Sequence, residues 1–170
     1  MTTAEAHERA HPLRVAFAAR DFDGVAAALA PDVVLRSPIT SAVRFEGRDE
    51  VTSLLREVRE VLEELEYVQD FGDGDEHVLV FRARAGGGRL DGVDLLRLDD
   101  DGRVREITVF MRPLTGLTAL TAVLAPRLAR RRGRGRAALV AAMARPLALL
   151  TRAGDVTTAR LAIGNRVTRV

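Results

Sequence analysis

Apolar and polar residues alternate through the middle of the chain, and a period of two predicts β-strands. Glycine and aspartate separate the alternating segments, and these residues tolerate the positive φ angles of tight hairpin turns. The pattern predicts four consecutive strands, at residues 66–71, 77–85, 90–98 and 103–112. Strands that follow one another through such short turns form an antiparallel meander.

Before this meander, apolar residues recur every three or four positions, which is the period of amphipathic helices. Residues 14–30 follow it with a break at 20–22, where Asp21 and Asp23 are suited to cap a second helix. Residues 47–65 form a long helix with one apolar face: Val51, Leu54, Leu55, Val58, Leu62 and Leu65. With short strands at 33–36 and 43–45, this order predicts an α+β fold. The helices would lie on one face of a curved antiparallel sheet.

The last third of the chain differs in charge from the rest. Helical periodicity returns at 114–132 and 136–152, whereas 155–170 show no clear pattern. The net charge of +2 conceals 15 Arg and 23 acids before residue 113, against 11 Arg and one acid from there onward. This contrast predicts an α+β domain over 1–113 and a basic helical extension over 114–170.

Composition excludes several classes of function. The chain has no Cys, and therefore no disulfide framework or thiolate chemistry, and all 26 of its basic residues are Arg. The first 20 residues carry charges throughout, unlike a signal peptide. The apolar stretches 114–126 and 137–150 are shorter than the ~20 residues that span a bilayer. A cytoplasmic protein is expected.

One carboxylate, Asp94, lies within the apolar run Val93, Leu95 and Leu96. Burying a charged carboxylate is costly unless it has a partner or stays protonated. Two interpretations follow. Asp94 is either a carboxyl group in an apolar pocket, acting as a hydrogen-bond donor or proton shuttle, or one half of a structural ion pair with an arginine.

Several local sequences together resemble the SnoaL-like proteins of the nuclear transport factor 2 superfamily. They are Asp21-Phe22-Asp23-Gly24, Phe45-Glu46-Gly47 and the hairpin over 92–114, in the same order of elements. The resemblance covers about residues 8–120. It implies a cone-shaped barrel with a pocket for a small, mostly apolar organic molecule, and a homodimer interface on the outer sheet face. The family includes isomerases, cyclases, epoxide hydrolases and non-catalytic carriers, so the fold alone does not select one.

The resemblance also assigns catalytic positions. The protonated aspartic acid of ketosteroid isomerases falls on Asp94, but their general base falls on Ser37 and their donor tyrosine near Leu13. The last-strand acid of limonene-type epoxide hydrolases falls on Val109. If the protein is an enzyme, isomerase- or cyclase-type proton transfer through Asp94 is implied, with Ser37, Tyr67 and Arg36 as polar helpers. The alternative is a non-catalytic binding or scaffold module that acts through its basic tail.

Strand alternation places Asp94 on the same face as the apolar residues of the neighbouring strands. Together with the first helix, these residues define the expected ligand pocket: Leu13, Phe17, Ser37, Tyr67, Leu79, Phe81, Leu96, Ile107, Val109 and Met111. No cofactor is expected.

Two remaining motifs carry weaker signals. His7-Glu8-Arg9-Ala10-His11 matches a zinc-hydrolase spacing, but Pro12 disfavours a helix at His11, so no metal site is expected. The arginine-rich segment 127–136 is suited to an anionic lipid surface, to nucleic acid or to the acidic body of the domain itself. The tail has no aromatic side chains for base stacking, which argues against sequence-specific nucleic-acid binding. At most, weak contact with an anionic surface is expected.

Overall fold

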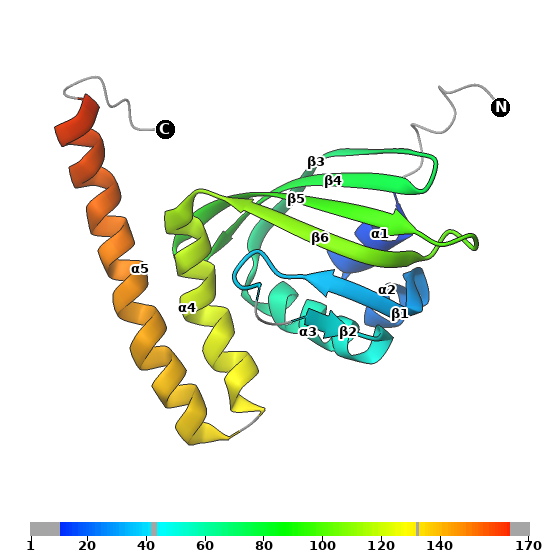
Figure 1. Cartoon of the computed structure of the whole chain (residues 1–170), viewed down its shortest axis with the longest axis horizontal. Coiled ribbons are helices and arrows are strands. Elements are labelled where there is room, and N and C mark those ends of the chain that lie inside the picture. The colour runs from blue at the N-terminus through cyan, green and yellow to red at the C-terminus, as the bar shows by residue number, and fades with distance from the viewer. Residues whose placement is uncertain (1–10, 42–43, 132, 164–170) are drawn as a thin grey trace.

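The computed structural model describes residues 11–41, 44–131 and 133–163, and the side chains of its last helix up to Asp155 and at Thr157. The helices are α1 (Pro12–Ala19), α2 (Phe22–Ala28), α3 (Arg48–Val61), α4 (Leu114–Arg130) and α5 (Arg134–Ile163). The strands are β1 (Leu29–Arg36), β2 (Arg44–Glu46), β3 (Glu63–Asp73), β4 (Glu76–Ala85), β5 (Gly88–Leu98) and β6 (Val104–Arg112). The expected α+β fold is confirmed (Figure 1).

The six strands form one curved, unclosed sheet in the order β2-β1-β6-β5-β4-β3. The meander from β3 to β6 is antiparallel, as the alternation predicts. β1, however, pairs with β6 in parallel, so the sheet is mixed rather than wholly antiparallel. A parallel pair needs a long crossover connection, and here that connection contains α3 and the first three strands of the meander.

The first two helices are separated by a sharp break at the predicted place. Arg20 adopts a left-handed conformation at the end of α1, and the Asp21 carboxylate accepts a hydrogen bond from the backbone N–H of Gly24 (2.9 Å). Asp21 is therefore the cap of α2, because its oxygen satisfies an N–H that the first helical turn leaves free. The strand after α2 begins at Leu29, earlier than the predicted residue 33.

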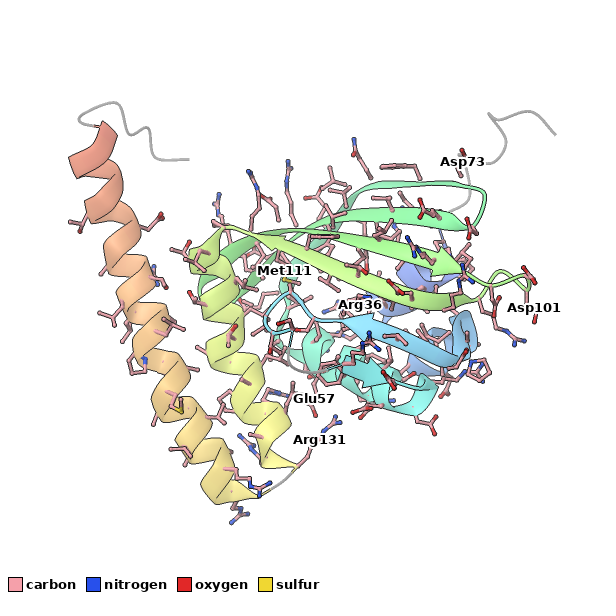
Figure 2. The ribbon with its side chains drawn as sticks, in the orientation of Figure 1. Arg36, Glu57, Asp73, Asp101, Met111 and Arg131 are labelled. Atoms are coloured by element: carbon pink, nitrogen blue, oxygen red, sulfur yellow. The ribbon has the colours of Figure 1, made fainter. Side chains whose placement is uncertain are left out.

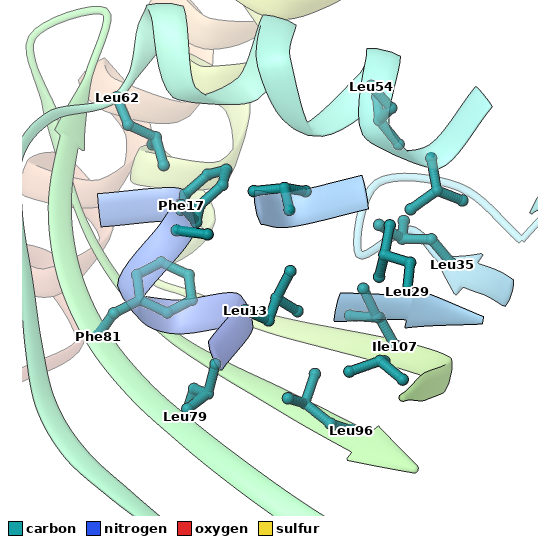
Figure 3. Close-up of a cluster of buried hydrophobic side chains, with 14 of the residues drawn as sticks. Leu13, Phe17, Leu29, Leu35, Leu54, Leu62, Leu79, Phe81, Leu96 and Ile107 are labelled. Atoms are coloured by element: carbon teal, nitrogen blue, oxygen red, sulfur yellow. The ribbon is translucent and has the colours of Figure 1, made fainter. Parts of the chain in front are cut away.

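The core lies between the concave face of the sheet and α1–α3. It combines Leu13 and Phe17 from α1 with inward-facing residues of β4, β5 and β6 (Figure 3). Leu79 and Leu96 are at most 1% exposed, so the concave face of the sheet is covered at these residues. The predicted apolar face of the long helix also packs inward, since Val51 and Leu54 are buried.

The two C-terminal helices form a hairpin, with α4 next to the sheet and α5 outermost (Figure 1). α4 buries Leu120 and Leu124 in the core. Glu57 of α3 forms ion pairs with Arg127 in α4 (3.1 Å) and with Arg131 at the C-terminal end of that helix (3.2 Å) (Figure 2). α4 is thus fixed to the acidic body by both packing and charge.

The outermost helix is longer than predicted, because α5 continues through residues 155–163, where the sequence shows no clear periodicity. Thr151 and Thr157 interrupt the apolar pattern. Within the helix their hydroxyl groups donate to the carbonyl oxygens of Leu147 (3.0 Å) and Ala153 (3.0 Å). By length and composition alone, Arg134–Asp155 is long and apolar enough to cross a bilayer. The sequence did not predict this, because the apolar stretch recognised there, residues 137–150, is shorter than the helix.

Candidate functional site

A cavity of about 220 Å³ lies between the concave face of the sheet and the helices. Its wall is built from α1, β1, β2, α3, the four meander strands and α4, and from the loop at residues 37–40. Nearly all of the lining is apolar. Among the described residues that line it, the polar side chains are Ser37, Thr40, Tyr67 and Asp94. A cavity of this kind binds an apolar molecule and orients it through a few polar contacts.

α4 closes one side of this cavity. Leu120, Leu124 and Leu128 recur every four residues on one face of the helix and contribute to the cavity wall. The sequence shows these leucines as an apolar stripe. The change in charge at residue 113, however, assigned them to the basic extension and not to the domain that holds the pocket. α4, which follows the last strand of the sheet, is thus part of the candidate site.

Asp94 is the one carboxylate among the described lining residues. It lies at the middle of β5, paired with Leu79 on β4 and Val109 on β6, so apolar side chains flank it on both neighbouring strands. Its side chain forms no hydrogen bond or ion pair within the described part of the chain. Burial without a compensating partner raises the pKa of Asp94 to about 7. The carboxyl group is therefore largely neutral below pH 7 and available to a ligand.

Tyr67 is the second titratable group on the cavity wall. Burial raises the pKa of its hydroxyl, and the nearby Asp94 carboxylate raises it further. The ring is packed edge-on against Phe81 (6.2 Å between centroids), and the Arg14 guanidinium lies over it at 5.2 Å. Tyr67 therefore keeps its proton and can act as a hydrogen-bond donor beside Asp94.

Phe81 holds this wall in place from β4. It is paired with Gly92 on β5, and its ring lies against the space where a Gly92 side chain would be. Only glycine leaves room for the ring at that position, which is two residues before Asp94. This close approach explains a glycine inside a strand of otherwise large residues.

A polar cluster anchors the start of α1 to the sheet next to the cavity. Asp70 on β3 accepts hydrogen bonds from the His77 ring, from Arg14 (2.9 Å) and from the backbone N–H of His11 (3.1 Å). Burial alone would raise the pKa of Asp70, but these three donors lower it overall. Arg14 connects this cluster to the site, because the same guanidinium lies over Tyr67.

His11 is buried at the other side of this cluster, 4.9 Å from the His77 ring. Its Nδ1 accepts the backbone N–H of Leu13 (3.2 Å) and so caps α1, whereas its Nε2 has no partner within the described residues. Burial lowers the pKa of His11 to about 4, and the neighbouring His77 adds to this effect. His11 is therefore neutral at pH 7.

Nine of the ten expected pocket residues line the cavity, and Leu96 does not. Leu96 is fully buried, opposite His77 on β4, and is not among the residues that line the cavity. Arg36, expected as a polar helper, forms an ion pair with Glu106 (3.0 Å) at the surface and is absent from the lining (Figure 2). The sequence did not indicate the Asp70 cluster, because its members are up to 66 residues apart and meet only through the pairing of β3 with β4 and the docking of α1.

The remaining motifs have structural roles or lie outside the description. His7 precedes the described residues, and His11 caps a helix. No cluster of three or more His, Cys, Asp or Glu suited to a metal ion occurs within residues 11–41, 44–131 and 133–163. Asp99 accepts the N–H groups of Asp101 and Arg103, so residues 99–102 form a hairpin turn.

Comparison with known proteins identifies the family. The model of the SnoaL-like domain matches residues 12–107. A solved steroid delta-isomerase from Pseudomonas aeruginosa is 35% identical, with a TM-score of 0.66, covering 77% of this chain and 95% of its own. The chain therefore belongs to the SnoaL-like family, in the nuclear transport factor 2 superfamily, as the resemblance implied.

Two further solved structures share the fold. An uncharacterized bacterial protein with a cystatin-like fold from Silicibacter pomeroyi is 30% identical, with a TM-score of 0.65, covering 68% of this chain and 82% of its own. A putative ketosteroid isomerase from Kribbella flavida is 27% identical, with a TM-score of 0.52, covering 60% of this chain and 73% of its own. No curated protein matches the chain.

Proposed function

We propose that this SnoaL-like protein binds a small, mostly apolar organic molecule that carries one ketone, enol or phenol oxygen. The observation that carries the proposal is Asp94, a partnerless carboxyl group on the wall of an apolar cavity. A neutral Asp94 and the Tyr67 hydroxyl both donate hydrogen bonds, so together they fit a single oxygen acceptor. The apolar lining contributes most of the binding free energy by removing ligand surface from water.

We further propose isomerase- or cyclase-type proton transfer through Asp94. Similarity to the Pseudomonas aeruginosa steroid delta-isomerase supports this class of reaction. A group with a pKa near 7 exchanges protons readily at neutral pH, which general acid–base catalysis requires. Ser37 and Leu13 stand where the resemblance places the base and the donor tyrosine of ketosteroid isomerases. Asp94 would therefore have to act with Tyr67 as its only titratable neighbour among the described lining residues.

Ligand binding is expected to depend on the protonation of Asp94. 2-Acetonaphthone, an apolar ketone whose oxygen only accepts hydrogen bonds, is expected to bind the wild-type protein in titration calorimetry. Its affinity should fall about tenfold per pH unit above pH 7, as Asp94 loses its proton. Asp94→Asn keeps a hydrogen-bond donor, the amide N–H, that does not ionise in this range. The affinity of this variant for the ligand should therefore be independent of pH between 5 and 9. Asp94→Leu should lose about tenfold at pH 6, because the hydrogen bond is removed.

The matched control is Asp91→Asn, three residues earlier on β5, where Asp91 forms ion pairs with Arg82 and Arg112 at the surface. This variant should bind 2-acetonaphthone like the wild type. Wild-type affinity that is flat across pH 7, or equal affinity in Asp94→Leu, would contradict the proposed role of Asp94. Single-base proton transfer predicts the opposite pH trend for turnover, which would rise through pH 7 as Asp94 ionises.

We also propose a homodimer formed through the outer sheet face. Val68, Val80, Val93 and Phe110 line a shallow hollow there, and Phe110 is 56% exposed. Phe110→Glu would place a charge in the centre of that interface, and should therefore yield a monomer in sedimentation equilibrium at concentrations where the wild type is dimeric. Val15→Glu, at a similarly exposed residue of α1, is the control. A wild-type monomer, or an unchanged dimer in Phe110→Glu, would contradict this interface.

A further inference from the structure

α5 presents a continuous apolar face that no other described element covers. Its inward side packs against α4, while five large apolar side chains point away from it, and Leu139, Met143 and Leu150 are 63, 71 and 70% exposed. In Figure 1, α5 lies on the far side of α4 from the sheet. We call this face the α5 outer face: Leu139, Met143, Leu147, Leu149 and Leu150.

Arginine side chains border this face along one edge. Arg130, Arg134 and Arg145 line an open groove between α4 and α5, floored by alanines and two prolines. None of the three side chains forms an ion pair or hydrogen bond with a described residue, whereas those of Arg127 and Arg131 are bound to Glu57. From Arg134 to Gly154 the helix contains no acid. The groove therefore offers three uncompensated guanidinium groups beside an exposed apolar surface.

We propose that the α4–α5 hairpin docks on an anionic lipid bilayer, with α5 lying in the plane of the interface. The α5 outer face would enter the boundary between headgroups and acyl chains, and the groove arginines would bind lipid phosphates. Amphipathic helices with an apolar face and a basic polar face bind anionic membranes in this orientation. Arginine forms bidentate hydrogen bonds to phosphate while its aliphatic stem stays in apolar surroundings.

Charge favours this occupant over a second copy of the chain. Pairing two α5 outer faces would bring Arg134, Arg136, Arg145 and Arg152 of each helix together without an intervening acid. An anionic bilayer offers the opposite charge. A membrane-spanning orientation, although allowed by length, would place Arg145 at the centre of the hydrocarbon layer, where arginine is strongly disfavoured. A span would also require α5 to separate from α4, which packs along it in the hairpin.

Vesicle co-sedimentation with the full chain tests the proposal. Vesicles of phosphatidylcholine mixed with phosphatidylglycerol should sediment the protein at low salt, and phosphatidylcholine alone should not. High salt should weaken binding, because exposed charges are screened. Arg134→Gln combined with Arg145→Gln should reduce the partition coefficient about thirty-fold. Met143→Ser combined with Leu150→Ser should reduce it at least tenfold, because less apolar surface enters the bilayer.

The controls match charge and exposure elsewhere on the protein. Arg89→Gln combined with Arg103→Gln removes the same charge from exposed positions on β5 and just before β6, and Val15→Ser removes an exposed apolar side chain from α1. Both should partition like the wild type, and circular dichroism should show that all variants fold. Equal sedimentation with neutral vesicles, unchanged binding of the α5 variants, or resistance to alkaline extraction would overturn the proposal. The proposal would also be overturned if the wild type bound no vesicles and instead formed a dimer in solution that Met143→Ser combined with Leu150→Ser dissociates.

Discussion

Asp94→Asn is expected to make the protein more stable at pH 8, by up to about 4 kcal/mol in the free energy of unfolding. The folded-state pKa of Asp94 is about 7, against 3.8 in the unfolded chain. Between these values the folded state binds more protons, so the Asp94 contribution is fully present below pH 3.8 and is lost as the pH rises to 7. Each pKa unit corresponds to about 1.4 kcal/mol. Asparagine has the same shape and no charge to bury.

Denaturant unfolding at a series of pH values measures this effect. The difference between variant and wild type should be near zero at pH 4 and reach its full size above pH 7. Asp91→Asn removes a surface carboxylate from the same strand and should change stability by less than about 1 kcal/mol at any pH. Equal stability of Asp94→Asn and wild type at pH 8 would mean that the carboxylate is compensated after all, as in the ion-pair interpretation of the sequence.

Ionised Asp94 destabilises the fold at neutral pH, and this loss of stability indicates a ligand site rather than a structural role for the carboxyl group. A residue that weakens the fold at neutral pH, and that no described side chain compensates, is expected where a ligand supplies the missing partner. A bound oxygen acceptor would stabilise the protonated form of Asp94 and raise its pKa further. Ligand and pH therefore act on the same group. 2-Acetonaphthone should stabilise the wild type progressively less above pH 7, whereas it should stabilise Asp94→Asn equally at pH 6 and pH 8.

The sequence predicts this part of the molecule because strand periodicity is local. Alternation alone puts Asp94, Val109 and Met111 on one face, and all three line the cavity. Leu96 obeys the same alternation, yet it lies in the core, because periodicity assigns a face and says nothing of where free space lies along the strand. The parallel pairing of β1 with β6 and the closing of the cavity by α4 depend on long-range packing. The change in charge at residue 113 does not show that α4 closes the cavity, because α4 carries arginines at its C-terminal end and buried leucines along one face.

His11→Asn is expected to make the protein more resistant to acid, by up to about 3 kcal/mol at pH 4. The folded-state pKa of His11 is about 4, against 6.5 in the unfolded chain. The unfolded state therefore binds more protons between pH 6.5 and 4, and the wild type loses stability as the pH falls through this window. Asparagine does not titrate there, and its oxygen can still cap α1 by accepting the N–H of Leu13. It also removes the Nε2 atom, which has no partner in the described structure.

The two groups act in opposite directions over nearly the same pH range, which dictates how the measurement must be made. As the pH falls from 7 to 4, His11 destabilises the fold by about 3 kcal/mol while protonation of Asp94 stabilises it by about 4 kcal/mol. Wild-type stability should therefore vary little there. Asp94→Asn alone should expose the loss due to His11, and His11→Asn alone the gain due to Asp94. The double variant should be nearly independent of pH above 4, below which protonation of Asp70 breaks its bonds to His77 and Arg14. A steep slope remaining in the double variant would show that other groups control acid stability.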